Sequence, residues 1–372
     1  MRVFVTGAQG FIGKNFVVHL QEMDWLVLPF GREDDKSELP KLVEQADAIV
    51  HLAGENRSKN VDDFAKVNAG LTQDLCDVVK ACGRKIPFIL ASSIQVDHNN
   101  PYGLSKLAAE KKVQQLSKEA DIPSYIYRLP NVFGKWCKPN YNSVVATFCH
   151  NIVRGLPIQI NDESAQLSLV YIDDLMAEFV RVLRDEHRSI SRFVQVIPEY
   201  QITLGELADK IRAFKNSREN LMSEAVGTGL TRALYSTYIS YLDASQFSYL
   251  IPAYRDDRGI FIEMLKTQTN GQFSFFTANQ GVTRGGHYHH TKTEKFLVIK
   301  GKARFRFRHL ITGEFYEIYT SGRVSEIVEI VPGWAHDVTN VGDEELICML
   351  WANEIFDSEK PDTFAFPVNS DV

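Results

Sequence analysis

A glycine-rich turn near the start of the chain limits the folds that are open to it. Residues 3–5 are apolar and predict a short buried strand, and Gly7, Gly10 and Gly13 follow at the opening of an expected helix. Glycines here allow a tight turn, a close approach of the backbone to a diphosphate, and close packing of helix on sheet. The spacing is Gly-x-x-Gly-x-x-Gly, not the more general Gly-x-Gly-x-x-Gly. The turn therefore predicts a dinucleotide site.

Strands and helices alternate along the first part of the chain, from residue 1 to about residue 215. Apolar runs at residues 25–30, 48–52 and 88–91 are separated by amphipathic stretches at residues 66–81 and 106–118. Alternation of this kind predicts a parallel sheet covered by helices on both faces. We expect an α/β domain with a Rossmann-type, doubly wound parallel sheet.

The pattern changes from Tyr254 onward. Short alternating stretches such as residues 303–308 lie between glycine turns, which is typical of an antiparallel barrel or sandwich. A chain of 372 residues is also too long for one ordinary core. We expect two domains, residues 1–243 and residues 244–372.

Composition excludes several classes of partner. A formal net charge of -6 argues against binding to nucleic acid or to an anionic membrane, because both require a basic surface. No apolar run approaches the ~20 residues needed to span a bilayer. The five cysteines are odd in number and lack metal-type spacing, which fits reduced thiols. We expect a cytoplasmic enzyme that acts on a small molecule.

Two side chains of an expected helix are suited to proton transfer. Tyr102 and Lys106 are four residues apart and so share one helix face. A phenol titrates near ~10 unaided, so a neighbouring cation is needed if it is to transfer protons at neutral pH. A surface Tyr–Lys pair is the alternative. A catalytic role for the pair is favoured by two further features. Ser92 and Ser93 follow the strand expected at residues 88–91, where a hydroxyl can reach a substrate carbonyl, and Asn68 lies on the preceding expected helix.

Arg32 follows the second expected strand. An NAD site would place a carboxylate near this position for the ribose hydroxyls, whereas an arginine suits the 2′-phosphate of NADPH. Arg32 is alternatively a solvated surface residue, and Glu33 and Asp34 follow it closely. The pattern favours NADPH over NADH.

These motifs, in this order, resemble the extended short-chain dehydrogenase/reductase family that acts on nucleotide sugars. The resemblance covers roughly residues 1–240 and includes the motifs at residues 47–54, 128–134 and 170–175. It implies that Tyr102 is the general acid/base and that Lys106 binds the nicotinamide ribose and lowers the pKa of the phenol. It also implies that Ser93 holds the substrate oxygen. Asn131 is implied to contact the sugar nucleotide, and the expected cofactor contacts are Gly7, Gln9, Gly10, Phe11, Ile12, Gly13, Arg32, Leu52, Ala53, Asn68, Tyr102 and Lys106.

One departure from the family narrows the reaction. Related 4,6-dehydratases carry an Asp-Glu pair after the hydroxyl residue, whereas Ile94 and Gln95 stand here. Without that acid and base, water elimination has no obvious proton carriers. A reductase is therefore favoured over a dehydratase.

A second set of side chains has metal-ligand spacing. His287 and His289 alternate on an expected strand, so both imidazoles point the same way, and Glu294 and His336 follow. Residues 281–301 and 332–340 resemble the two motifs of the cupin superfamily of jelly-roll barrels, which implies these four ligands. Three imidazoles and a carboxylate suit zinc or another divalent first-row ion. His290 is a competing ligand, and many cupins have lost their metal.

Residues 254–263 resemble the opening of cupins that epimerise or isomerise 4-keto sugar nucleotides. The whole chain resembles bifunctional capsular-polysaccharide enzymes of UDP-N-acetyl-L-fucosamine synthesis. That resemblance implies epimerisation at carbon 3 of a UDP-2-acetamido-2,6-dideoxy-4-hexulose in the cupin. NADPH-dependent reduction of the 4-keto group would then give a UDP-N-acetyl-6-deoxy-L-talosamine product. Epimerisation must come first, because reduction destroys the ketone that acidifies carbon 3. We expect a homodimer that involves the cupin domain.

Two other interpretations remain open at this stage. In the first, the cupin is only an oligomerisation or regulatory module and the chain is a simple reductase. In the second, the first domain holds its cofactor tightly and catalyses an epimerisation without net redox change.

Overall fold

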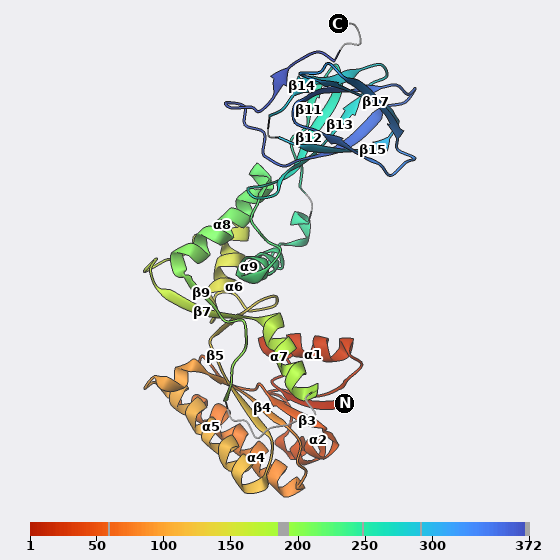
Figure 1. Ribbon diagram of the computed structural model, residues 1–372. Coiled ribbons are helices and arrows are strands. Elements are labelled where there is room, and N and C mark those ends of the chain that lie inside the picture. Colours follow the sequence, from red (N-terminus) through yellow and green to blue (C-terminus); the bar gives the residue numbers. More distant parts are fainter. Residues whose placement is uncertain (59, 185–192, 248, 291, 369–372) are drawn as a thin grey trace. The chain divides into compact units, whose positions relative to one another are not determined.

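The computed structural model of the protein describes residues 1–58, 60–184, 193–247, 249–290 and 292–368. The chain forms two compact units, Met1–Ile211 with Arg232–Leu242, and Arg212–Thr231 with Asp243–Val372. The first unit mixes helices and strands, and the second is mainly β (Figure 1). The predicted combination of an α/β part and an all-β part is therefore confirmed.

The first unit is built on a parallel sheet in the order β2-β1-β3-β4-β5-β8. All five neighbouring pairs are parallel, as the predicted Rossmann-type sheet requires. The strands are β1 (Arg2–Thr6), β2 (Leu26–Phe30), β3 (Ala48–His51), β4 (Phe88–Ser93), β5 (Ser124–Leu129) and β8 (Phe193–Val194).

Helices cover both faces of this sheet because its strands alternate two sets of apolar side chains. Val3 and Val5 of β1 pack with one group of helices, and Phe4 packs with the other. Figure 1 shows the first group, α1 and α7, on one side of the sheet, and the second group, α2, α4 and α5, on the other. The bounds are α1 (Phe11–Glu22), α7 (Ile172–Arg184), α2 (Leu39–Gln45), α4 (Leu71–Cys82) and α5 (Pro101–Ala120).

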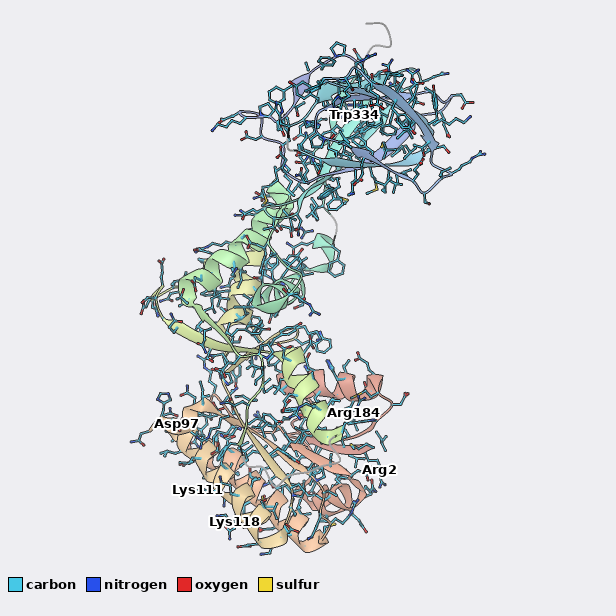
Figure 2. The ribbon with its side chains drawn as sticks, viewed as in Figure 1. Arg2, Asp97, Lys111, Lys118, Arg184 and Trp334 are labelled. Carbon is cyan, nitrogen blue, oxygen red and sulfur yellow. The ribbon has the colours of Figure 1, made fainter. Side chains whose placement is uncertain are left out.

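Helix α5 illustrates the amphipathic pattern that places these helices. Val113 and Leu116 are buried in the core that faces the sheet, whereas Lys111 and Lys118 are exposed on the outer side of the helix (Figure 2). A stripe of this kind orients the helix about its axis. The same orientation decides where the side chains near its N-terminus point.

A smaller sheet and further helices, including the short α3 (Val61–Phe64), complete the first unit. The sheet has the order β6-β7-β9, with β6 and β7 parallel and β7 and β9 antiparallel. Its strands are β6 (Asn131–Phe133), β7 (Gln166–Tyr171) and β9 (Tyr200–Thr203), and the longer helices are α6 (Val144–Val153), α8 (Leu204–Asn220) and α9 (Gly229–Ile239). Helix α8 continues into the second unit from Arg212. Every helix in the described part of the chain is too short or too polar to cross a membrane.

The second unit contains two sheets with a core between them. One has the order β10-β12-β13-β20-β15-β18, with β11 paired to β12, and the other has the order β17-β16-β19-β14-β21. Phe276 and Phe296 of the first sheet pack with Phe305 of the second. Their strands are β10 (Met222–Ser223), β11 (Tyr254–Asp256), β12 (Gly259–Thr267), β13 (Gly271–Ala278), β14 (Thr283–Tyr288), β15 (Glu294–Lys300), β16 (Lys302–His309), β17 (Phe315–Ser321), β18 (Ile327–Ile330), β19 (Trp334–Asn340), β20 (Leu346–Ala352) and β21 (Phe364–Ala365).

Candidate active site and metal centre

The turn between β1 and α1 has the geometry that its glycines predict. Gly7 has a φ of +69°, and a Cβ there would lie 2.7 Å from the backbone nitrogen of Ala53. A Cβ on Gly13 would lie only 2.1 Å from the carbonyl oxygen of Gly7. Gly10 is the N-cap of α1 and has no side chain to cap it. The amides of Phe11 and Ile12 therefore begin a helix whose N-terminus can accept an anionic group.

The other predicted cofactor residues of this region lie beside the turn. Leu52 and Ala53 follow β3 and donate their amides to the backbone and side-chain oxygens of Thr6, both at 3.2 Å. The Gln9 side chain lies next to Gly31, where a Cβ would be 3.5 Å from Gln9 Cδ. The ends of β1, β2 and β3 thus meet at one edge of the sheet, where ligands of open α/β sheets bind.

Helix α5 brings Tyr102 to Ser93, which ends β4. Asn100 caps the helix by accepting a hydrogen bond from the Gly103 amide at 2.8 Å. Gly103 itself permits the close approach, because a Cβ there would lie 2.1 Å from the carbonyl oxygen of Gln95. Burial raises the pKa of Tyr102, and a hydrogen bond with the Ser93 hydroxyl lowers it in part. The phenol therefore keeps its proton at neutral pH.

Lys106 lies one helical turn beyond Tyr102 and is buried. Its ammonium donates to the carbonyl oxygen of Ala91 at 2.8 Å. It also lies against Gly54, where a Cβ would be 3.2 Å from Nζ. Burial lowers the pKa of Lys106 to about 8, although the nearby charge of Glu110 opposes this shift. The side chain is thus a buried cation at neutral pH.

Asn68 connects the loop after β3 to α5. It lies in a π-helical turn, residues 65–70, a feature that often marks functional sites. Its carboxamide accepts a hydrogen bond from the Glu55 amide at 2.8 Å and donates to the Glu55 carbonyl at 2.9 Å. It also donates to the Ser105 hydroxyl at 2.9 Å, and Ser105 donates to the Tyr102 carbonyl at 2.7 Å. Asn68 therefore holds the predicted cofactor loop against the helix that carries the predicted catalytic pair.

The sequence analysis missed Glu110, which is 1% exposed. Its carboxylate accepts from the Ser92 hydroxyl at 2.6 Å and from two nitrogens of Arg128 at 2.8 and 3.0 Å. A buried charge needs such partners. Glu110 of α5 is thus bonded to β4 through Ser92 and to β5 through Arg128. The spacing of Tyr102, Lys106 and Glu110 along one helix face could have revealed it.

Arg32 extends from the end of β2 and pairs with Glu55 at 2.8 Å. The side chain is still 82% exposed, so its guanidinium remains accessible to a ligand. Asp34, the alternative partner for a ribose, accepts a hydrogen bond from the Gly31 amide at 2.7 Å. Both a cation and a carboxylate therefore lie at this end of β2.

A cavity of about 770 Å³ lies in the first unit, at the loop before α6. Its volume is in the range of small-molecule sites. Tyr141 joins this cavity to the cofactor loop, because its carbonyl accepts from Arg57 and its hydroxyl lies 3.5 Å from Glu55. Asn131, the predicted sugar-nucleotide contact, is not among the lining residues and donates to the Ser168 carbonyl at 3.2 Å. The lining residues are Asn140, Tyr141, Asn142, Ser143, Val144, Thr147, Phe148, Asn151, Pro157, Ile158 and Gln159.

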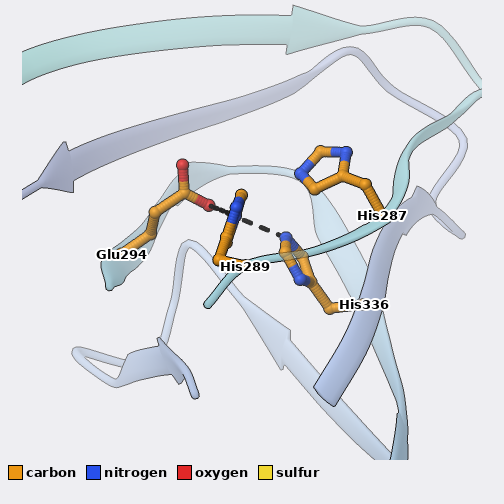
Figure 3. Close-up of side chains that lie close together, drawn as sticks. All are labelled: His287, His289, Glu294 and His336. Atoms are coloured by element: carbon orange, nitrogen blue, oxygen red, sulfur yellow. Dashed lines mark ion pairs between the residues drawn. The ribbon is translucent and has the colours of Figure 1, made fainter. Parts of the chain in front are cut away.

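The four predicted metal ligands come together between the sheets of the second unit. Ligand atoms of His287, His289, Glu294 and His336 all lie within 4.8 Å of one another. Figure 3 shows the three imidazoles and the carboxylate around a common centre. His287 of β14 pairs directly with His336 of β19 after a bulge that begins at Gly285. The bulge turns β14 so that His287 faces inward.

The protonation of this cluster suits a divalent cation. Burial and the neighbouring histidines lower the pKa of His287 to about 3. Burial opposes ionisation of Glu294, but the neighbouring His289 and His336 and the charge of Lys292 outweigh it, so the pKa of Glu294 is below its usual range. Neutral imidazoles and an ionised carboxylate are the forms that bind zinc.

Hydrogen bonding supports the same conclusion. His289 Nδ1 contacts the Asp362 carbonyl oxygen at 2.5 Å. Its Nε2 is buried without a hydrogen-bond partner among the described residues, and it lies 3.4 Å from a Glu294 oxygen. A buried lone pair of this kind is costly unless a ligand uses it. His290 is not one of the four, because its ring packs against Phe364 with a centroid separation of 4.9 Å.

Comparison with known protein families gives one match in the α/β part of the chain and another in the all-β part. Residues 3–192 match the NAD dependent epimerase/dehydratase family. Residues 254–364 match the Polysaccharide biosynthesis C-terminal domain. The first match contains the glycine turn, Tyr102 and Lys106, and the second contains the cluster of three histidines and Glu294.

Similar proteins extend over almost the whole chain. A UDP-2-acetamido-2,6-beta-L-arabino-hexul-4-ose reductase from Pseudomonas aeruginosa is 57% identical over 369 residues, 99% of this chain and 99% of that protein. The crystal structure of the capsular polysaccharide assembling protein CapF from Staphylococcus aureus superposes with a TM-score of 0.91 and 41% identity, and covers 99% of this chain and 100% of that chain. The predicted resemblance to capsular-polysaccharide enzymes is confirmed.

A more distant structure shares only the fold. UDP-glucuronic acid 4-epimerase from Bacillus cereus, solved with NAD, has a TM-score of 0.55 and 20% identity. It covers 65% of this chain and 98% of that chain.

Proposed function

Because the chain belongs to the NAD dependent epimerase/dehydratase family, with a Polysaccharide biosynthesis C-terminal domain after it, we propose that it is a bifunctional nucleotide-sugar enzyme. Residues 1–243 would form an NADPH-dependent 4-ketoreductase, and residues 244–372 a cupin that epimerises the substrate first. The observation that carries the reductase is Tyr102, hydrogen-bonded to Ser93 and followed one turn later by the buried Lys106. The full-length similarity to a UDP-hexulose reductase supports the substrate class.

The reduction follows from these three side chains. NADPH, when bound, supplies the hydride for carbon 4 of the keto-sugar. The Ser93 and Tyr102 hydroxyls are the donors that orient the carbonyl oxygen, and Tyr102 gives that oxygen its phenolic proton. The Lys106 ammonium stabilises the phenolate that remains on Tyr102, which then regains a proton from solvent. In the proposed site Lys106 also binds the nicotinamide ribose, and Asn68 holds the cofactor loop.

We assign the sugar nucleotide to the cavity before α6. Its side chains include several amides, which can pair with the donors and acceptors of a nucleotide base, and Tyr141, which can stack on one. The proposed substrate is a UDP-2-acetamido-2,6-dideoxy-4-hexulose, and the product a UDP-N-acetyl-6-deoxy-L-talosamine in capsular polysaccharide synthesis. Asn131 would contact the sugar at the edge of the site.

The second activity is assigned to the cluster of His287, His289, Glu294 and His336. These residues would hold one divalent ion per chain, zinc in our proposal, and this ion supplies electrophilic stabilisation of an enolate when bound. The imidazoles and the carboxylate would hold this ion, because their ligand atoms all lie within 4.8 Å of one another. Epimerisation at carbon 3 precedes reduction, because only the ketone makes the neighbouring C–H acidic.

The second unit also offers a surface for the homodimer that we propose. Five apolar side chains form a row across neighbouring strands, on the face opposite to the core. Met349 is 37% exposed and Ile327 is 53% exposed. A second copy of the chain would remove this row from water, and Met349→Glu should then weaken the dimer in sedimentation experiments. The row consists of Ile262, Phe275, Met349, Leu297 and Ile327.

One pair of experiments tests both activities. Purified protein, the keto-sugar and NADPH should give stoichiometric NADPH oxidation. The same substrate in deuterated water without NADPH should gain deuterium at carbon 3, as read by NMR. Deuterium incorporation that needs NADPH would contradict the proposed order. Substrate turnover without net NADPH oxidation would favour a redox-neutral epimerase, and oxidation without any exchange would leave the cupin as a structural module.

A further inference from the structure

The last described part of the chain contacts the loop between β14 and β15, which carries His289 and leads to Glu294. Asp362 makes three contacts with this loop. Its carbonyl oxygen lies 2.5 Å from His289 Nδ1, and its two carboxylate oxygens accept the amides of His290 at 2.9 Å and Lys292 at 2.8 Å. A carbonyl can only accept, so Nδ1 of His289 carries the proton and Nε2 faces the cluster with a free lone pair.

The residues after Asp362 attach to β14. Strand β21 pairs with it, with Ala365 opposite His287 and Phe364 opposite Tyr288. The Phe364 ring stacks on Tyr288 with a centroid separation of 5.3 Å. The Phe366 amide donates to the Gly286 carbonyl at 2.8 Å. We call residues 362–366 the C-terminal strap.

The strap also reaches Glu294. Lys292 is 7% exposed, and its ammonium donates to the Thr363 hydroxyl at 3.3 Å. The same ammonium lies 3.3 Å from Glu294 Oε1. The other carboxylate oxygen, Oε2, lies 3.4 Å from His289 and 3.6 Å from His336. Lys292 thus holds one oxygen of Glu294 and leaves the other directed at the imidazoles.

We propose that the C-terminal strap positions the metal ligands, with Asp362 as its central residue. It selects the tautomer of His289, binds the backbone amides of His290 and Lys292 within the loop, and orients Glu294 through Thr363 and Lys292. Groups outside the ligand set often tune metal affinity in this way, because a ligand already in place loses less entropy on binding. The proposal rests on the metal centre assigned above.

The test is zinc affinity in the full-length protein, measured by competition with a chromophoric chelator. Asp362→Ala should weaken zinc binding by about 10- to 100-fold, the usual effect of removing a group that orients a ligand. Asp362→Asn should have a smaller effect, since it keeps one acceptor oxygen. Thr363→Val should weaken binding through Lys292 alone. Asp357→Ala is the matched control, because Asp357 accepts two backbone amides, from Glu359 and Lys360, at the nearby turn.

The outcomes separate this proposal from the metal centre itself. Wild-type protein that binds one zinc ion, together with an Asp362→Ala variant of the same affinity, would overturn the role of the strap and leave the metal centre standing. Wild-type protein that binds no zinc would overturn both. Circular dichroism shows whether each variant keeps its barrel. If Asp362→Ala unfolds, an unchanged affinity in Asp362→Asn and Thr363→Val overturns the proposal.

Discussion

The imidazole of His51 and the hydroxyl of Thr72 are joined by a hydrogen bond of 2.9 Å inside the first unit. Thr72 donates its own proton to the Asn68 carbonyl at 2.6 Å, so it accepts from His51 Nε2. Nδ1 of His51 then accepts from Thr6 at 2.6 Å, and the Thr6 oxygen accepts from the Ala53 amide at 3.2 Å. This chain of bonds connects the glycine turn to Asn68, so the proposed cofactor site depends on a neutral histidine.

Acid should weaken the protein through this histidine. Burial, and to a lesser degree the charge of Lys106, lowers the pKa of His51 to about 3. The pKa of a histidine in the unfolded chain is about 6.5. Between these two pKa values the unfolded chain binds more protons than the folded chain, so the stability of the fold decreases as the pH is lowered. We expect the Tm of wild-type protein to fall more steeply from pH 6.5 downward than that of His51→Gln. Parallel pH profiles in differential scanning calorimetry would contradict this.

Tyr102→Phe should lower the rate of NADPH oxidation by about 100-fold or more, because only the proton donor is lost. NADPH binding, followed by fluorescence, should remain nearly intact. Tyr316→Phe, which changes an exposed tyrosine of the second unit, serves as the control. A Tyr102→Phe enzyme that keeps more than about a tenth of the wild-type turnover must use another donor.

Arg32→Ala should raise the KM for NADPH far more than the KM for NADH. The exposed guanidinium offers a charge-assisted contact that exists only with the 2′-phosphate. Arg2→Ala is the matched control, because Arg2 is also a partly exposed arginine paired with a carboxylate, that of Asp47. Steady-state kinetics with both cofactors decide the matter. Equal changes in the two KM values would show that Arg32 does not read the phosphate.

His336→Ala, or removal of metal with a chelator, should stop solvent deuterium from entering carbon 3 of the keto-sugar. Loss of the ion removes the proposed stabiliser of the enolate. NADPH binding should survive, since the first unit has its own core. His309→Ala, which alters a ring packed on Trp334, is the control. Exchange at the wild-type rate in a folded, metal-free protein would move the chemistry onto other side chains, and a collapsed barrel in circular dichroism would indicate a structural metal.

Most of the fold could be predicted from local patterns in the sequence. The glycine turn, the alternation of strands and helices, and the two-residue period after Tyr254 each reflect backbone geometry within a few residues. Gly7 shows this directly, since its φ of +69° suits glycine. The one-turn spacing of Tyr102 and Lys106 has the same local origin, whereas His289 lies just beyond the end of β14 and not on the strand as predicted.

Other features depend on contacts between distant parts of the chain. The grouping of residues 212–231 with the second unit reflects the pairing of β10 with β12. Glu110 appears in the sequence as an ordinary helix carboxylate, and only the packing of β4 and β5 on α5 gives it Ser92 and Arg128 as partners.

Local sequence patterns thus distinguish the two kinds of domain and locate the residues of the two proposed sites, because those signals repeat at the period of a helix or strand. The way in which these residues are held in place depends on contacts that form only in the folded chain. The tertiary structure removed His290 from the cluster of four, and it brought Asp362 to His289 across 73 residues of sequence. No local pattern encodes such a contact, since it exists only after the two sheets have packed and the chain end has paired with β14.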